Sequence, residues 1–321
     1  MIEQVCFPTL PSYLLAPYRA FLKERGLQDE GDAELTVLLL SDERIVGAGS
    51  LARNCIKQVA VHPDFLGEGL LNTLISTLVT EAMRQGRTQL FLFTKPALSD
   101  AFRSLGFSPL AKTNSMLLSE YPKGGLDRFL GSIPRHDGAN GCIVLNGDPL
   151  TNGHLRLIRY AAEHSDHLYL FVLSEQGSLF SPEQRLSFVT ECIRPFSNVS
   201  AHASRTYLVS RVTFPAYFLK EDAKLEAQDD LDLALFCQRI APALSIRTRF
   251  VGEEPFDPAT RTYNERMQVR LPESGISVRL LPRTDGISAS KVRSLLKEGR
   301  LDAVRRLVPE PVYAACLDLF G

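Results

Sequence analysis

The sequence predicts an α/β protein of two domains, an α+β domain followed by a doubly wound parallel sheet. Three observations lead to this prediction. The chain has 321 residues, more than the roughly 250–300 that one hydrophobic core usually holds. Residues 34–61 contain consecutive strand patterns with no helix between them. From Cys142 onward, apolar runs of strand length alternate instead with helical patterns, as in a parallel sheet.

The composition is that of an ordinary globular protein. Hydrophobic residues make up 45% and charged residues 23%, and no apolar run approaches the roughly 20 residues of a membrane helix. The formal net charge of −1 argues against a nucleic-acid surface, which needs a basic excess. The first residues, M-I-E-Q-V-C-F-P, lack the basic and apolar segments of a secretory signal. We therefore expect a cytoplasmic protein that binds neither nucleic acid nor a membrane.

The 6 cysteines are spread along the chain. They form no C-x-x-C pair, and none has a histidine at metal-ligand spacing. We expect them to be reduced and mostly buried, without a metal site.

The N-terminal domain is predicted to contain a β-hairpin at residues 34–40 and 44–53, followed by a strand at residues 56–61. The turn H-P-D-F-L-G-E-G-L then leads into a long amphipathic helix. Backbone amides at this helix start could hold a pyrophosphate, because Gly67 and Gly69 lack the side chains that would block it. In the alternative, the two glycines only allow the helix to pack closely on the strand.

Together with F-R-S-L-G-F at residues 102–107, this turn resembles the loop of the GNAT N-acyltransferase family, which holds the pyrophosphate of coenzyme A. The resemblance implies a GNAT-like α+β fold for residues 1–125, with Gly67 and Gly69 in a loop that binds pantetheine or acyl-coenzyme A. The family prefers Gln or Arg three residues before the first glycine, where this chain has the negatively charged Asp64. No side chain stands out as a general base for acetyl transfer, so we expect a binding domain.

Residues 126–140 are predicted to link the two domains. Glycine and proline are frequent around this segment and disfavour regular structure. One apolar patch, Leu126, Phe129 and Leu130, could form a single helical turn. The second domain then occupies residues 141–321.

The second domain opens with G-C-I-V-L-N-G-D-P-L-T-N-G-H at residues 141–154. Residues 142–145 have the length and β-branching of a buried parallel strand, which N-G-D-P cannot continue. A helix is predicted to begin near Gly153 and His154, because the following apolar residues recur at helical spacing. Its N-terminus would lie at the carboxyl end of the strand, where free N–H groups and a partial positive charge favour a phosphate.

Two residues of this helix start suit a phosphate. Gly153 would let the phosphate approach the backbone, and His154 would direct a ring N–H towards it. In the alternative, His154 only caps the helix, and Asn152 and Gly153 only turn the chain. Asp148 similarly either contacts the ligand indirectly or closes the turn.

Strands and helices are expected to alternate after this motif. The acidic residues 221–232 should mostly form a solvated surface, and we assign no structure to residues 205–218. The predicted elements are strands at residues 167–173, 199–203 and 247–251, and helices at residues 181–193 and 231–240.

The helix at residues 181–193 has a clear N-terminal signal. Ser181 is predicted as its N-cap, Pro182 as its first residue and Gln184 as the capping-box partner. Arg185, on the first turn, would be a phosphate ligand or part of a surface ion pair.

The strand at residues 247–251 should end at the same sheet edge as the first motif. Gly252 and Glu253, which follow it, can then contact a nucleotide. The next stretch, T-R-T-Y-N-E-R-M at residues 260–267, suits a base or substrate pocket.

A second anion site is predicted in G-I-S-A-S-K-V-R, residues 286–293. Ser288 or Ser290 would cap a helix that ends at Gly299. The two hydroxyls and Arg293 then lie at one helix entrance.

The T-N-G-H tetrad followed by I-S-A-S-K-V-R resembles the HxGH nucleotidyltransferase superfamily, with Thr151 at the position of the first His. The resemblance implies a Rossmann-like, HUP-type fold that binds ATP with Mg²⁺, ligated mostly by phosphates and water. His154 and Thr151 would be catalytic, acting on the α-phosphate and the departing pyrophosphate. The residues expected to bind ATP are Asn146, Gly147, Asp148, Gly153, Arg185, Gly252, Glu253, Ser288, Ser290 and Arg293.

The whole chain resembles the citrate (pro-3S)-lyase ligase family. The resemblance rests on the domain order and on F-L-F-T-K-P (residues 91–96), S-R-V-T-F-P (210–215), F-V-G-E-E-P-F (250–256) and I-S-A-S. It implies that acetate and ATP acetylate the thiol of the dephospho-coenzyme-A-type prosthetic group on the citrate lyase acyl carrier subunit. The reaction would pass through acetyl-AMP and release AMP and pyrophosphate.

Two other functions remain open from the sequence. D-P-x-T-N-G-H is also the form of the motif in phosphopantetheine adenylyltransferases, although these are compact single domains. A nucleotide-sensing protein would bind ATP without turnover.

Overall fold

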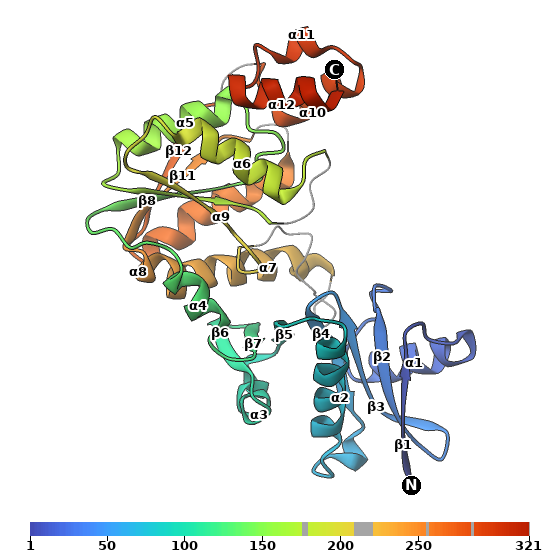
Figure 1. The fold of residues 1–321 in the computed structure, drawn as a ribbon. Coiled ribbons are helices and arrows are strands. Elements are labelled where there is room, and N and C mark those ends of the chain that lie inside the picture. Colours follow the sequence, from blue (N-terminus) through green and yellow to red (C-terminus); the bar gives the residue numbers. More distant parts are fainter. Residues whose placement is uncertain (175–178, 209–220, 255–256, 284–285, 321) are drawn as a thin grey trace. The chain divides into compact units, whose positions relative to one another are not determined.

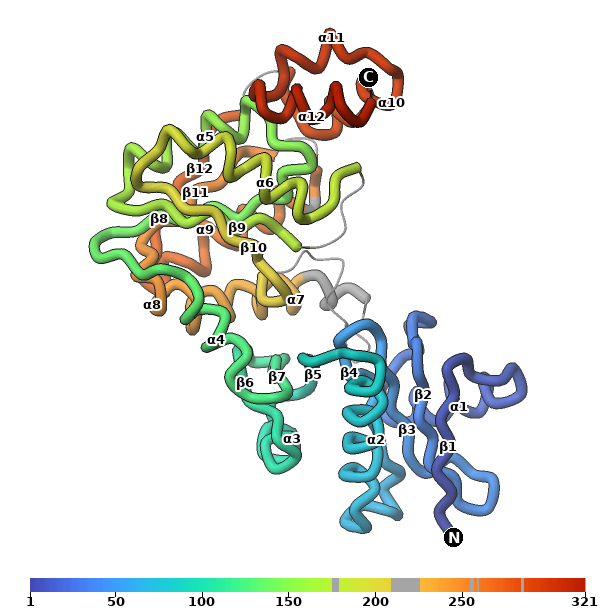
Figure 2. Tube along the Cα trace, in the orientation of Figure 1, coloured from blue at the N-terminus to red at the C-terminus, as the bar shows by residue number. Residues whose placement is uncertain are grey.

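The structure is a computed structural model that describes residues 1–174, 179–208, 221–254, 257–283 and 286–320. By its internal contacts the chain divides into two compact units. The first is Met1–Phe129 with Phe214–Ala234, and the second is Leu130–Thr213 with Leu235–Gly321. Each unit has its own sheet (Figures 1 and 2).

The first unit is built on a seven-stranded sheet with the strand order β1-β2-β3-β4-β5-β7-β6. Only the β4–β5 pair is parallel. Helix α1 packs on one face and helix α2 on the other, because successive residues of β2 point to opposite faces: Leu38 contacts the α1 side and Val37 the α2 side. The elements are β1 (Ile2–Phe7), α1 (Ser12–Glu24), β2 (Leu35–Ser41), β3 (Arg44–Ala52), β4 (Cys55–Val61), η1 (Pro63–Phe65), α2 (Leu70–Arg84), β5 (Leu90–Thr94), η2 (Pro96–Leu98), α3 (Ser99–Ser104), β6 (Ser108–Lys112) and β7 (Leu117–Tyr121).

This sheet confirms the predicted GNAT-like α+β fold. The predicted hairpin is β2–β3, and the predicted third strand and long helix are β4 and α2. The sequence reasoning had not assigned β1 and α1.

The second unit contains a five-stranded, fully parallel sheet with the order β10-β9-β8-β11-β12. Helices α5 and α6 cover one face, and α8 and α9 lie on the other (Figure 1). The predicted doubly wound sheet is therefore confirmed. Its elements are β8 (Asn140–Leu145), α5 (Asn152–Glu163), β9 (Leu168–Val172), α6 (Pro182–Ile193), β10 (Val199–Ala203), the π-helix η4 (Phe236–Ile240), α8 (Ala241–Ala243), β11 (Ile246–Gly252), α9 (Pro258–Glu273), β12 (Ser277–Leu281), α10 (Ala289–Lys297), α11 (Leu301–Val304) and α12 (Glu310–Phe320).

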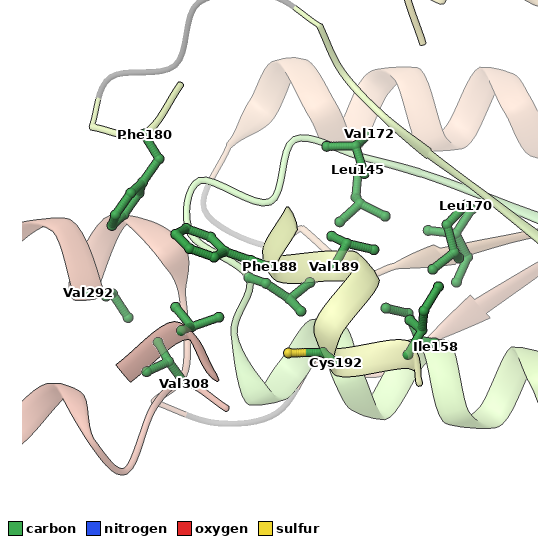
Figure 3. Packing of buried hydrophobic residues seen from close by; sticks show 14 of the residues in the cluster. Leu145, Ile158, Leu170, Val172, Phe180, Phe188, Val189, Cys192, Val292 and Val308 are labelled. Atoms are coloured by element: carbon green, nitrogen blue, oxygen red, sulfur yellow. The ribbon is translucent and has the colours of Figure 1, made fainter. Parts of the chain in front are cut away.

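The core of the second unit lies between the sheet and the helices α5, α6, α10 and α12. Figure 3 shows Val189 of α6 beside Leu145 of β8, whereas Phe188 extends to the other side, where its ring packs edge-on against Phe180 with the centroids 5.1 Å apart. Val292 of α10 belongs to the same buried cluster, so the packing of this core fixes α10 against the rest of the unit.

Two sequence predictions need correction. The acidic segment 221–232 lies in α7 (Glu221–Leu235), and where its side chains are described it is not mostly a solvated surface: Glu226 is exposed, but Asp230 and Asp232 are half-buried and Asp229 is only 1% exposed. The apolar residues Ala227, Leu231 and Leu235 are buried at a spacing of four, a helical face hidden by the acidic composition. The apolar patch of the linker forms α4 (Gly125–Gly131), a seven-residue helix instead of a single turn.

No helix in the described part of the chain is both long and apolar enough to cross a membrane.

Candidate active site

The loops that follow the parallel strands leave from one edge of the second sheet. The chain runs outwards from β8 through β9 to β10 and then returns to β11, on the other side of β8. The order of the strands therefore reverses between β8 and β11, and doubly wound sheets bind ligands at this position of the carboxyl edge. The first predicted motif follows β8, and Gly252 and Glu253 lie at the end of β11.

Thr151 and His154 cap α5 reciprocally. The His154 N–H donates to Thr151 Oγ1 at 3.4 Å, and the Thr151 N–H donates to His154 Nδ1 at 3.0 Å. The Thr151 hydroxyl also lies 2.9 Å from Nδ1. Because a backbone N–H can only donate, Nδ1 is the acceptor, and the hydrogen of the neutral ring is on Nε2. The cap thus fixes the orientation of the ring and the nitrogen that can donate.

Burial, with a smaller contribution from the positive charge of Arg283, lowers the pKa of His154 to about 4. The ring is therefore neutral at pH 7. Nε2 has no hydrogen-bond partner among the residues that the structure describes. His154 does cap the helix, as the structural alternative predicted, but only through Nδ1, so Nε2 is available to a ligand.

Asn152 and Gly153 are helical residues of α5, so the alternative that they only turn the chain is wrong. A Cβ built on Gly153 would lie 3.6 Å from Thr151 Oγ1 and 3.7 Å from Ile287 Cγ2, which are ordinary contact distances. Neither the backbone conformation nor the packing requires a glycine here. Ile287 belongs to the second predicted motif, so the two motifs are neighbours.

The second motif begins α10 in the predicted way. Ser288 is the N-cap and accepts from the Lys291 N–H at 3.1 Å, and its hydroxyl lies 3.1 Å from that of Ser290. Arg293 donates from Nη1 to the carbonyl oxygen of Asp148 at 2.6 Å. This bond joins the two motifs across 145 positions of sequence.

The turn after β8 is held from inside the unit. Gly147 has φ +62°, which a glycine adopts without strain. Arg185 is fully buried and donates to the carbonyl oxygen of Asn146 at 2.9 Å and to its side-chain oxygen. Burial excludes the surface ion pair that was the alternative for Arg185. Asp148 accepts from the Phe180 N–H at 3.1 Å, so it closes the turn onto the segment before α6.

A cleft of about 410 Å³ lies beside the end of β11. Gly252 is fixed there by Asn264, whose side-chain amide donates to the Gly252 carbonyl at 3.2 Å. The lining includes three residues of the T-R-T-Y-N-E-R-M stretch, in which we expected a pocket. The lining residues are Glu253, Glu254, Arg261, Asn264, Glu265, Gln268 and Leu280. Three of them are carboxylates, which suit hydroxyl and amino donors better than phosphates.

Sequence reasoning missed Arg283. It follows β12 at the carboxyl edge, is ion-paired with Glu254, and lies close enough to His154 to lower the pKa of the ring. The available signal was its position: it is the second residue after a strand that ends at this edge.

In the first unit, Gly67 and Gly69 precede α2 with φ values of +88° and +80°. A Cβ on either would meet nothing within 4 Å, so close packing does not explain these glycines. Gly69 is the N-cap of α2 and provides no side-chain cap.

Among the described residues, no group of three or more His, Cys, Asp or Glu side chains is arranged to hold a metal ion. The segment at residues 210–215 and the end of the 250–256 stretch, Pro255 and Phe256, lie outside the described residues.

Comparison with known proteins places the chain in a family. The family described as "Citrate lyase ligase C-terminal domain" matches residues 140–315. A citrate (pro-3S)-lyase ligase of Klebsiella pneumoniae is 38% identical over 312 residues, 93% of this chain and 91% of that one. A phosphopantetheine adenylyltransferase of Alkaliphilus oremlandii is 33% identical over 109 residues, 32% of this chain and 68% of that one. Thermotoga maritima TmcAL bound with alpha-thio ATP matches at 14% identity, covering 56% of each chain, with a TM-score of 0.38. From the family match and the near full-length identity, the chain belongs to the citrate lyase ligase family.

Proposed function

We propose that this protein acetylates the thiol of the dephospho-coenzyme-A-type prosthetic group on the citrate lyase acyl carrier subunit, using acetate and ATP. The observation that carries the proposal is the Arg293–Asp148 bond, which brings the two helix entrances together beside the Nε2–H of His154, for which the described residues provide no partner. A triphosphate is the ligand that such a pair of entrances fits best.

Activation by ATP follows from the chemistry of acetate. Acetate is a poor electrophile because its charge is delocalised and an oxide would have to leave. In the proposed first step, an acetate oxygen attacks the α-phosphorus of ATP and the bond to pyrophosphate breaks. In the second, the carrier thiolate attacks the acetyl carbon and AMP leaves, giving the thioester.

His154 would donate from Nε2 to the α-phosphate and stabilise the charge that develops as pyrophosphate leaves. Its donor is preorganised, since Thr151 occupies Nδ1. Thr151 is thus a positioning residue as well as a candidate hydroxyl donor. The absence of a Cβ at Gly153 would leave room for a phosphate at the helix entrance.

The other predicted residues are assigned to three roles: binding the phosphates, holding the turn after β8 in place and binding the nucleoside. Ser288, Ser290 and Arg293 would bind the β- and γ-phosphates. The carboxylate-lined cleft next to Gly252 and Glu253 would accept hydrogen bonds from the nucleoside. The residues that hold the loop in place are Asn146, Gly147, Asp148 and Arg185.

Mg²⁺ is expected to arrive with ATP. Because no protein cluster of ligands gathers among the described residues, phosphate oxygens and water would supply most of its coordination. The ion would neutralise phosphate charge, and the residues named above would orient the triphosphate.

The first unit would bind the coenzyme-A-like arm of the carrier. One feature supports this role: α2 begins after Gly67 and Gly69 without a side-chain cap. Uncapped helix amides favour a pyrophosphate.

The decisive experiment follows ATP breakdown with and without acetate and the deacetylated carrier protein. Acetate-dependent AMP formation, with a thioester on the carrier, is expected. Pyrophosphate release that depends on 4′-phosphopantetheine instead would select an adenylyltransferase, and ATP binding without turnover would select a sensor. Either result would contradict the proposal.

A further inference from the structure

Arg283 and Glu254 join two loops at the carboxyl edge of the second sheet. Glu254 follows β11 and Arg283 follows β12, and their side chains form an ion pair. The neighbouring Glu253 N–H donates to the Leu281 carbonyl at 2.9 Å, so the backbone already holds the two loops together. The ion pair is therefore not needed to join them.

The pair is partly open to solvent, with side-chain exposures of 22% for Arg283 and 31% for Glu254. Such pairs contribute little to folding, and a ligand with more negative charge than a carboxylate can compete for the guanidinium. Glu254 also lines the cleft assigned to the nucleoside. Arg283 is thus connected to that cleft through Glu254, while its charge also acts on His154.

The position of Arg283 relative to His154 gives it a second role. Its charge acts on the ring of His154, whose Nε2–H has no partner in the described part of the chain and marks the expected place of the α-phosphate. A guanidinium at this position could bind phosphate oxygens with two N–H groups, which a lysine could not do.

We propose that Arg283 is a further catalytic residue, which binds the α-phosphate of ATP beside His154, and that Glu254 is a positioning residue, which holds the guanidinium there until ATP displaces it. This inference rests on the proposed function. ATP binding would exchange the carboxylate of Glu254 for phosphate oxygens as the partner of Arg283.

The test compares Arg283→Gln, Glu254→Gln and the control Arg194→Gln in the full-length protein. Arg194 is suitable because it forms an exposed ion pair with Glu191 at 2.8 Å, away from the carboxyl edge. ATP affinity is measured by calorimetry, and the pKa of His154 by NMR titration of the ligand-free protein. Circular dichroism and thermal unfolding check the fold of each variant.

Arg283→Gln is expected to weaken ATP binding by about tenfold to a hundredfold, the effect of losing a charged hydrogen bond, and to raise the pKa of His154. Glu254→Gln should bind ATP as well as the wild type or more tightly, without raising this pKa. Arg194→Gln should change neither.

ATP binding by Arg283→Gln at wild-type affinity would overturn the inference. Equal weakening by Arg283→Gln and Glu254→Gln would also overturn it, because the pair would then act only as a scaffold. A wild-type protein that binds no ATP would overturn the proposed function itself, and this inference with it.

Discussion

Both units contain a helix that begins just after a strand, yet the surroundings of the two helix starts differ. In the second unit, α5 begins with a reciprocal cap between Thr151 and His154, and Arg293 of another helix reaches the turn before it. In the first unit, α2 begins after Gly69 with no side-chain cap, and the carboxylates of Asp64 and Glu68 lie in the loop. A helix N-terminus offers the same amides in both places. The start of α5 differs because side chains from distant elements converge on it.

Among the predicted substitutions, the largest effect on activity is expected from the loss of the His154 ring at the start of α5. His154→Ala is expected to lower pyrophosphate release by a factor of ~10² or more, because a positioned transition-state donor is lost. The fold should survive, with a cost of about 1 kcal/mol for the lost half of the capping box. His164→Ala is the control, since this exposed histidine ends the same helix. Wild-type rates of pyrophosphate release from His154→Ala would contradict the role.

Gly153→Ala should separate stability from activity at the same helix start. A Cβ has room there, and alanine favours a helix over glycine by about 1 kcal/mol, so the protein should become slightly more stable. The same methyl group would occupy the expected path of the phosphate and slow pyrophosphate release by about tenfold or more. Urea unfolding and pyrophosphate release measure the two effects. Gly131→Ala, where a Cβ meets nothing within 4 Å, should leave the rate unchanged. Unchanged activity of Gly153→Ala would remove the argument for a phosphate at this position.

Acid should destabilise the second unit, which contains the histidines with lowered pKa values. Burial lowers the pKa of His167 to about 4, with smaller contributions from His136 and His202, and the pKa of His202 is also lowered. Between pH 6.5 and 4 the unfolded chain then binds more protons than the folded one, so stability is lost as the pH falls through this window. We expect His167 to account for roughly 1 kcal/mol of this loss by pH 5, after allowance for solvent screening.

Urea unfolding at pH 7 and pH 5 tests this pH dependence. His167→Gln should lose less stability than the wild type between the two pH values, and His164→Gln should behave like the wild type. Equal losses in His167→Gln and the wild type would show that His167 does not contribute.

The smallest effect is expected at the α2 entrance. Asp64 is 75% exposed, and its charge opposes a pyrophosphate. Asp64→Gln should therefore tighten the binding of coenzyme A by about threefold, as expected for removal of one screened surface charge. Calorimetry with coenzyme A measures this change, with Asp100→Gln as an exposed control in the same unit. Weaker binding by Asp64→Gln would mean that Asp64 assists the ligand.

The sequence was sufficient for features that depend on near neighbours in the chain. The strand–turn–helix of residues 141–154, the capping boxes begun by Ser181 and Thr151, and the Ser288 cap all involve residues within a few positions of one another. The sequence predicted the Ser181 box directly, and it left Ser288 and Ser290 as alternative caps, of which the structure has Ser288. The sequence left two alternatives for His154, a helix cap or a phosphate ligand. The structure allows both, because Nδ1 makes the cap and Nε2 can donate to a ligand.

Only the tertiary structure decided which distant side chains meet. The buried Arg185 beneath Asn146, the bond from Arg293 to Asp148 and the closeness of Arg283 to His154 each join residues far apart in the chain. Such meetings depend on the order of the strands in the sheet, and β8 lies next to both β9 and β11 although β11 is about a hundred residues away. Local periodicity and capping determine the helices and their ends, because the hydrogen bonds within a helix and its cap join residues only a few positions apart. The strand order is determined by packing over the whole unit, and no local pattern contains it.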